Sequence, residues 1–426
     1  MYLTLLLLYV VDYCYIVFFK NDTTLADIDN HVNWVEFETN SNLAELKNSK
    51  LRNSFLQAAS EDKIGVTDQF KIGSISGYIG YFLDNTIEAI RKKNIVDFVE
   101  QNSLVKIDEN YTINSPTIQY GAPWGLARIS HREALSIDTF DQYLFDYNGG
   151  KGVTSYIIDT GININNIQFQ GRAKWGITIP QKALSFDGSG HGTHCSGTIG
   201  SRDFGVAKNV ELVAVKVLNA LGIGSISNII KGLEWVVQQH QLAISKKNKS
   251  FKGSTANMSL GGGFSQALNS AVNAASDQGI FIAVAAGNSH ADACDFSPAS
   301  AGKAISVGAS TIADDVASFS NIGKCVDIFG PGLNILSTYI GSNNATAYLS
   351  GTSMACPHIN GLQAYFLSLL PELTSDYSGT SITPDQLKKH IIAFGTHNAL
   401  NLVPADTPNV LGFNGAGRSL EDFWSS

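Results

Sequence analysis

Short apolar runs alternate with longer amphipathic segments from residue 123 onward, and this alternation constrains the fold more than any other feature. Residues 152–158 and 210–218 predict buried strands, and residues 280–286 are apolar at every position. A strand with no polar position is typical of a parallel sheet that helices cover on both faces. We therefore expect an α/β fold with a doubly wound, mostly parallel sheet and helices on each side.

The segments between these strands carry a helical pattern. Residues 227–238 and 265–278 predict helices, and in the second Ser265 can cap the start while Gly279 can end it. Asp159 follows the first strand, and Gly287 and Asn288 follow the last. Ligands of such sheets bind outside the carboxyl ends of the strands, so these residues should meet at one edge.

Four short segments carry residues suited to nucleophilic catalysis. Asp159 opens Asp-Thr-Gly, His191 lies in Gly-Ser-Gly-His-Gly-Thr-His-Cys, Asn288 follows Ala-Ala-Gly, and Ser353 lies in Ser-Gly-Thr-Ser-Met-Ala-Cys-Pro. A serine hydroxyl becomes a good nucleophile when a histidine takes its proton and a carboxylate orients that histidine. The Ser353 amide at a helix start and the Asn288 side chain would then stabilise an oxyanion.

Each segment has an ordinary interpretation when it is taken alone. Asp-Thr-Gly after a strand is often a turn, and Asn288 suits a left-handed turn position. His191, His194 and Cys195 have the spacing of metal ligands, but no further ligand from a remote part of the sequence accompanies them. Residues 222–224 (Gly-Ile-Gly) lack the third glycine of a dinucleotide site. The joint occurrence of all four segments favours catalysis over these alternatives.

The N-terminal region has a different texture. Residues 1–11 are apolar, and we interpret them as the remnant of a secretory signal, although a basic start and a small cleavage site are missing; an extension of the first strand is the alternative. A first strand is expected over residues 15–19. The Asn-, Lys- and Glu-rich stretch that follows predicts a small α+β unit that ends in a linker over residues 108–122. The expected organisation is a signal remnant, an α+β unit and an α/β domain, over residues 1–14, 15–112 and 113–426.

Charge and hydropathy exclude two classes of partner. The formal net charge is −8, and no stretch clusters the Lys and Arg that a phosphate-binding surface needs, so nucleic acid is excluded. No run of about 18 apolar residues offers a membrane span.

The four segments, in this order, resemble the subtilisin-like serine peptidases of the proteinase K branch. Residues 123–132 (Pro-Trp-Gly-Leu-Ala-Arg-Ile-Ser-His-Arg) look like the mature N-terminus of the fungal vacuolar members, and residues 252–263 and 407–411 extend the similarity. The first hundred residues resemble the inhibitory prosegment of that family. The resemblance implies a serine endopeptidase that is made as a self-processed zymogen.

The resemblance also implies a role for individual residues. Asp159 would orient His191, the general base, while Ser353 attacks and Asn288 completes the oxyanion hole; His194 would be structural. Broad specificity with a preference for large apolar or aromatic side chains before the scissile bond is implied. The implied substrate strand comprises Gly222, Ile223, Gly224 and Ser225, and the implied pocket walls comprise Ser259, Leu260, Gly261, Ala285, Ala286 and Gly287.

Cysteines and metal ligands are also assigned by the resemblance. It implies a disulfide between Cys294 and Cys325 and a buried thiol at Cys195, whereas Cys356 departs from the usual Ser or Thr. A disulfide indicates an oxidising compartment, which for this family is the vacuole, with secretion as the alternative. No cofactor is required, but a structural calcium ion would bind the two backbone carbonyls and the carboxylate of Gly302, Ala304 and Asp327.

The implied partners are protein and peptide substrates, the chain's own prosegment and a separate protein inhibitor, and the chain is expected to be a monomer. A catalytically silent, protease-like binding protein is the alternative function, but it would need a substituted catalytic residue, and none is substituted. An α/β-hydrolase esterase would need Gly-x-Ser-x-Gly, and Ser353 has no such flanks.

Overall fold

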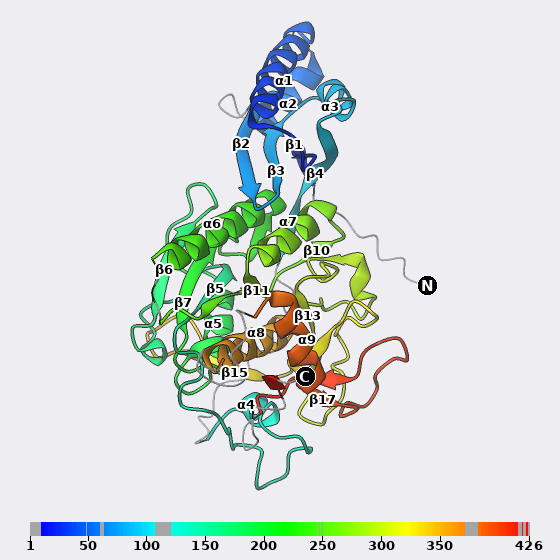
Figure 1. Ribbon diagram of the computed structural model, residues 1–426. Helices are drawn as coiled ribbons and strands as arrows, with labels where there is room; N and C mark the ends of the chain where they lie inside the picture. Colours follow the sequence, from blue (N-terminus) through cyan, green and yellow to red (C-terminus); the bar gives the residue numbers. More distant parts are fainter. Residues whose placement is uncertain are drawn as a thin grey trace.

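The structure is a computed structural model. It describes residues 10–47, 49–59, 64–106, 121–246, 248, 250–370, 382–415, 420 and 423–424. The chain forms two bodies, an N-terminal body within residues 10–106 and a larger C-terminal body within residues 121–424. Figure 1 shows the N-terminal body, in blue, standing on helices α6 and α7 of the larger one.

The N-terminal body is an antiparallel sheet in the order β2-β3-β1-β4, with helices against one face. This is the small α+β unit that the sequence predicts. Its elements are β1 (Val10–Phe19), α1 (Leu25–Glu45), α2 (Lys50–Ala59), β2 (Gly65–Ile72), β3 (Ile75–Tyr81), α3 (Asp84–Arg91) and β4 (Val96–Lys106). Strand β1 begins before residue 15, so residues 10–14 belong to the sheet, and the remainder of the expected signal remnant lies outside the described residues.

The apolar run over residues 14–19 of β1 reflects burial on both sides. Tyr15, Val17 and Phe19 pack into the core of the N-terminal body, whereas Ile16 and Phe18 pack toward the C-terminal body. Successive side chains of a strand point to opposite faces, so a strand between two packed layers has no polar positions. The sheet is therefore sandwiched between its own helices and the larger body.

The C-terminal body is built on a nine-stranded sheet in the order β17-β18-β14-β13-β11-β9-β5-β7-β6, in which every pair is parallel except β17 with β18. The expected doubly wound α/β fold is confirmed. The strands in chain order are β5 (Val153–Asp159), β6 (Ala173–Thr178), β7 (Glu211–Lys216), β9 (Gly253–Met258), β11 (Ile280–Ala285), β13 (Ile305–Ser310), β14 (Ile328–Pro331), β17 (Thr396–His397) and β18 (Val410–Leu411).

Helices cover both faces of this sheet. On one face α6 (Ile226–Ser245) and α7 (Gln266–Asp277) pack their apolar stripes on the strands, and Ser265 caps α7 as expected. On the other face α5 (His191–Gly200) and α8 (Thr352–Ser368) pack on the strands and form the apolar core of that side. Helices α5 and α8 thus both start near the carboxyl end of the sheet, where the predicted catalytic residues stand.

Two further observations concern the compartment and the membrane. Cys294 and Cys325, the two cysteines that the resemblance pairs, form a disulfide with a Cα–Cα distance of 5.2 Å. Within the described part of the chain, none of the helices has the length and apolar character that crossing a bilayer demands.

Candidate active site

Asp159 is the last residue of β5 and is fully buried. Both of its carboxylate oxygens lie 2.9 Å from Nδ1 of His191, and the amide of Thr160 donates to Oδ1 at 2.6 Å. A carboxylate held in this way selects the imidazole tautomer with the proton on Nδ1. The other ring nitrogen, Nε2, is then the basic one.

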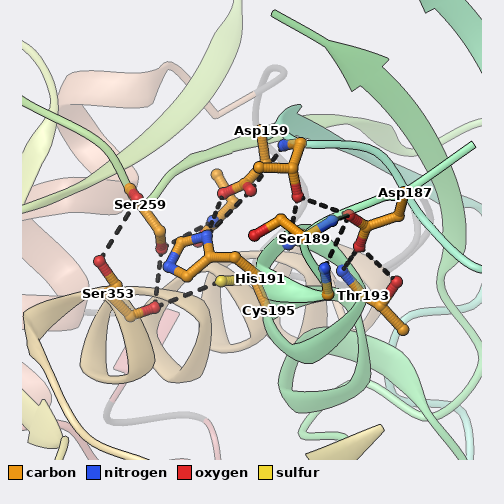
Figure 2. Close-up of polar contacts among 12 residues, drawn as sticks. Asp159, Asp187, Ser189, His191, Thr193, Cys195, Ser259 and Ser353 are labelled. Atoms are coloured by element: carbon orange, nitrogen blue, oxygen red, sulfur yellow. Dashed lines mark hydrogen bonds and ion pairs between the residues drawn. The ribbon is translucent and has the colours of Figure 1, made fainter. Parts of the chain in front are cut away.

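His191 is the first residue of α5, and Gly190 before it has φ 94°, a left-handed conformation that favours glycine. In Figure 2 the imidazole lies between the Asp159 carboxylate and Ser353. The sequence segments that end β5 and begin α5 therefore meet, as the sheet-edge argument predicts.

Asp187 anchors the loop that leads to His191, and the sequence analysis missed it. Its Oδ1 accepts hydrogen bonds from Thr160 Oγ1 and from the amides of Ser189 and Gly190, and its Oδ2 accepts from the amide and hydroxyl of Thr193. This buried carboxylate ties the end of β5 to the start of α5 (Figure 2). The sequence feature that could have identified it is an acidic residue three positions before Gly190 in a glycine-rich turn.

Ser353 is the second residue of α8, so its backbone amide is at the positive end of a long helix. Its hydroxyl donates to the carbonyl of Ser259 at 3.3 Å, and its own carbonyl accepts from Ser259 Oγ at 2.8 Å and from Cys195 Sγ at 3.4 Å. These contacts fix the start of α8 against β9 and α5.

Asn288 follows β11 and faces the same helix start. Its Oδ1 accepts from both the amide and the hydroxyl of Thr352, each at 2.8 Å. With the oxygen bound to Thr352, the amide nitrogen lies at the opposite edge of the planar carboxamide group. A side-chain amide nitrogen and a backbone amide at a helix start are donors of the kind that stabilise an oxyanion.

The alternative of a metal site is not supported by the second histidine. His194 Nε2 contacts the carbonyls of Ile335 and Ala347 at 2.9 and 3.1 Å, and burial lowers its pKa to about 3. Asp159, His191 and Cys195 have potential ligand atoms within 4.8 Å of one another, but the first two are engaged with each other. His194 is therefore held by backbone carbonyls, and Cys195 is a buried thiol close to His191.

A small pocket opens next to Ser353. Five of the six predicted wall residues line it, whereas Ser259 instead holds the backbone of Ser353. Gly262, Thr352 and Ser353 extend segments that the sequence already singles out, whereas Phe296, Ser297 and Ala299 come from a segment that carries no recognisable motif. The complete lining is Leu260, Gly261, Gly262, Ala285, Ala286, Gly287, Phe296, Ser297, Ala299, Thr352 and Ser353.

The predicted substrate strand is occupied by the N-terminal body. Strand β8 (Ile223–Ser225) pairs antiparallel with the end of β4, with Leu104 opposite Ser225 and Lys106 opposite Ile223. The chain of the N-terminal body thus enters the site as an added strand, the mode in which an extended peptide binds a sheet edge.

Polar contacts support this docking. The carboxylate of Glu100 accepts from Ser265 Oγ and, at 2.8 Å, from the amide of Ala267, and therefore caps α7. Asn102 donates to Ser227 Oγ at 2.9 Å at the start of α6. The N-terminal body thus binds the first turns of two helices through their unsatisfied amides and hydroxyls.

The expected calcium site is not available to a metal, which corrects the sequence analysis. The ammonium of Lys388 donates to the carbonyls of Gly302 and Ala304 and to Oδ2 of Asp327, at 3.0, 2.7 and 2.8 Å. All three expected ligands therefore already bind a cationic side chain. The sequence could not reveal this, because Lys388 is 61 positions from Asp327 along the chain.

The parallel α/β fold and the site at its carboxyl edge are those of a subtilisin-like serine hydrolase. Comparison with known proteins agrees: residues 150–412 match the Subtilase family and residues 14–108 match Peptidase inhibitor I9. The chain belongs to the Subtilase family, with an N-terminal prosegment of the inhibitor type.

Individual relatives extend this comparison. The chain is 52% identical to Cerevisin of Saccharomyces cerevisiae over 96% of its own length and 65% of that protein, so it spans about two thirds of that relative. It is 62% identical to the subtilisin-like serine protease Rho m 2.0101 of Rhodotorula mucilaginosa, over 80% of this chain and 98% of that protein. The crystal structure of a cold-adapted subtilisin-like serine proteinase is similar with a TM-score of 0.61 and 40% identity, covering 69% of this chain and 99% of that one.

Proposed function

We propose that this chain is a serine endopeptidase in which Asp159, His191 and Ser353 form the catalytic triad. The observation that carries the proposal is the pair of 2.9 Å contacts from the Asp159 carboxylate to Nδ1 of His191, beside a serine at the start of a helix. Such an arrangement makes Nε2 of His191 the base for the serine hydroxyl.

The reaction follows from these positions. Ser353 Oγ attacks the scissile carbonyl while His191 Nε2 takes the hydroxyl proton, and the oxyanion accepts from the Ser353 amide and the Asn288 amide nitrogen. His191 then gives the proton to the leaving amine, which departs and leaves an acyl-enzyme. A water molecule, activated by the same base, hydrolyses that ester and restores Ser353.

Substrate binding rests on main-chain pairing and one apolar pocket. An extended peptide pairing with Gly222–Ser225 is held mostly through its backbone, which gives broad tolerance of sequence. The lining of the pocket beside Ser353 carries no charged side chain. We therefore propose a preference for large apolar or aromatic residues immediately before the scissile bond.

The chain is proposed to be a precursor, with a prosegment over residues 15–112 and a catalytic domain over residues 113–426. The added strand at β8 resembles a bound product, so cutting after it would be intramolecular and would depend on Ser353. The disulfide suits a vacuolar or secreted enzyme. Substrates, the prosegment and a separate protein inhibitor are the proposed partners of a monomeric enzyme.

The test compares the full chain with Ser353→Ala, each purified from a host without secreted proteases. We expect the parent to hydrolyse peptide substrates and to acquire an N-terminus within residues 108–122, while Ser353→Ala does neither. Ser245→Ala, at the exposed last residue of α6, serves as the control and should retain both. A Ser353→Ala chain that matures and hydrolyses peptides at the parental rate would refute the triad.

A further inference from the structure

Lys388 makes a contact set that is unusual for a lysine near the protein surface. It lies on α9 (Pro384–Phe394), and its side chain is only 14% exposed. Its ammonium reaches Gly302 O, Ala304 O and Asp327 Oδ2 at 3.0, 2.7 and 2.8 Å. These oxygens come from two segments, the loop before β13 and the residue that precedes β14.

The chemistry of the three oxygens is that of a cation site. A lysine ammonium has three N–H donors, and here each finds one acceptor. A calcium ion requires six to eight oxygen ligands at about 2.3–2.6 Å, so an ion bound to the same oxygens would occupy the space of the Lys388 nitrogen. The two cations also repel each other, so they exclude one another.

The acceptors depend on a positive charge. Besides Lys388, Oδ2 of Asp327 accepts from the amide of Ser306 at 2.8 Å, and its carboxylate is 23% exposed. Removing the ammonium would leave two carbonyls and one carboxylate oxygen converging on a vacated point, with solvent access for further water ligands.

We propose that the Lys388 ammonium is a built-in cation that replaces a metal ion in joining α9 to β13 and β14. The junction is then held without calcium. It also follows that removal of the ammonium converts Gly302, Ala304 and Asp327 into a calcium-binding site.

The experiment uses the full chain carrying Ser353→Ala, which prevents autolysis, and compares it with the same chain carrying Lys388→Met. Lys389→Met is the matched control, because Lys389 is adjacent on α9 but is 75% exposed and, within the described part of the chain, pairs with Asp385. Calcium binding is counted by calorimetric titration, and the apparent Tm is measured at one scan rate with chelator or with calcium.

We expect Lys388→Met to lower the Tm in chelator by about 3–8 °C, and Lys389→Met by less than about 1 °C. Calcium should restore part of the loss in Lys388→Met, which should bind one more calcium ion than its parent. Adding Asp327→Asn to Lys388→Met should abolish that extra ion.

Two results would overturn the proposal. One is a Lys388→Met chain that matches the Lys389→Met control in Tm and gains no calcium. The other is a parent that loses a bound calcium ion on Asp327→Asn alone. If Lys388→Met does not fold, crystals of the parent soaked in a lanthanide decide: a lanthanide peak at Asp327 contradicts the proposal, and its absence there with peaks elsewhere supports it.

Discussion

Asn288 accepts hydrogen bonds from the amide and hydroxyl of Thr352 on its side-chain oxygen, and the proposed mechanism assigns its amide nitrogen to the oxyanion. Asn288→Ala should lower kcat by about 100- to 1,000-fold with little change in KM, because the donor acts on charge that develops only in the transition state. Steady-state hydrolysis of a peptide ester measures this. An unchanged kcat would remove Asn288 from the oxyanion hole.

We expect Asp187 to act as a positioning residue, since it binds the loop around His191 and not the His191 side chain itself. Asp187→Asn replaces an acceptor by a donor that faces backbone amides, so the loop should shift. We expect kcat to fall by about 10- to 100-fold while KM changes little. Asp203→Asn, at an exposed Arg202–Asp203 pair, is the control and should leave kcat unchanged. A change in KM with an unchanged kcat would contradict the assignment.

The residues that the sequence could predict share one property: they stand in short motifs at the ends of strands or the starts of helices. Asp159, His191 and Ser353 are of this kind. Asp187 and Lys388 are not, because their roles arise from contacts between segments with no fixed spacing in sequence. Phe296 in the pocket was missed for the same reason.

Helix starts decide how the two bodies meet, and Glu100 supplies the clearest case. Its carboxylate caps α7, a helix that already has Ser265 as its own cap. Glu100→Gln should weaken the binding of the cleaved prosegment by about 3- to 30-fold, because the charge at the helix start is lost. Inhibition of peptide hydrolysis by the prosegment measures it. Glu88→Gln, exposed on α3, is the control, and equal effects of both changes would exclude the cap.

The disulfide closes a 31-residue separation that includes parts of the pocket lining. Replacing both Cys294 and Cys325 by Ala should lower the free energy of unfolding by about 2–4 kcal/mol, because the unfolded chain gains freedom. Equilibrium unfolding in urea, with both chains carrying Ser353→Ala to prevent autolysis, measures the loss. Peptide mapping in which both cysteines of the parent are alkylated without reduction would contradict the pairing.

Element boundaries were predictable where caps exist and not elsewhere. Helix α7 has the expected limits because Ser265 and Gly279 enclose it, whereas α6 continues to Ser245, beyond the predicted residue 238, since no breaker ends it there. The end of strand β4 also has no cap, because its last residues pair with β8 of the other body. Such long-range pairing leaves no local signal.

Acidification should affect the stability of the whole molecule, and it should do so by destabilising the N-terminal body. His31 is buried against Tyr78, and burial, aided by the charge of Lys93, lowers its pKa to about 4. A histidine with a lowered pKa stabilises the fold above the unfolded pKa of about 6.5, and this stability is lost as the pH falls toward 4. Burial raises the pKa of Glu234, so the contribution of this group to stability increases as the pH falls.

We therefore expect the N-terminal body of the Ser353→Ala chain to lose stability between about pH 6.5 and pH 4, and His31→Phe to reduce that loss. Tryptophan fluorescence reports it, because Trp34 is next to His31. His397→Phe, at an exposed site on β17, is the control, and the comparison with it removes the contribution of Glu234. Identical pH profiles for His31→Phe and the parent would contradict the expectation.

The pairing of β4 with β8 makes inhibition depend on whether the chain is intact. While the chain is continuous, the inhibiting strand has a high effective concentration at the site, and dilution of the sample does not lower it. After the cut, the same strand is a separate molecule, and the inhibited fraction obeys mass action. A processed sample should therefore become active on dilution alone, whereas an uncut sample should remain inactive at every dilution.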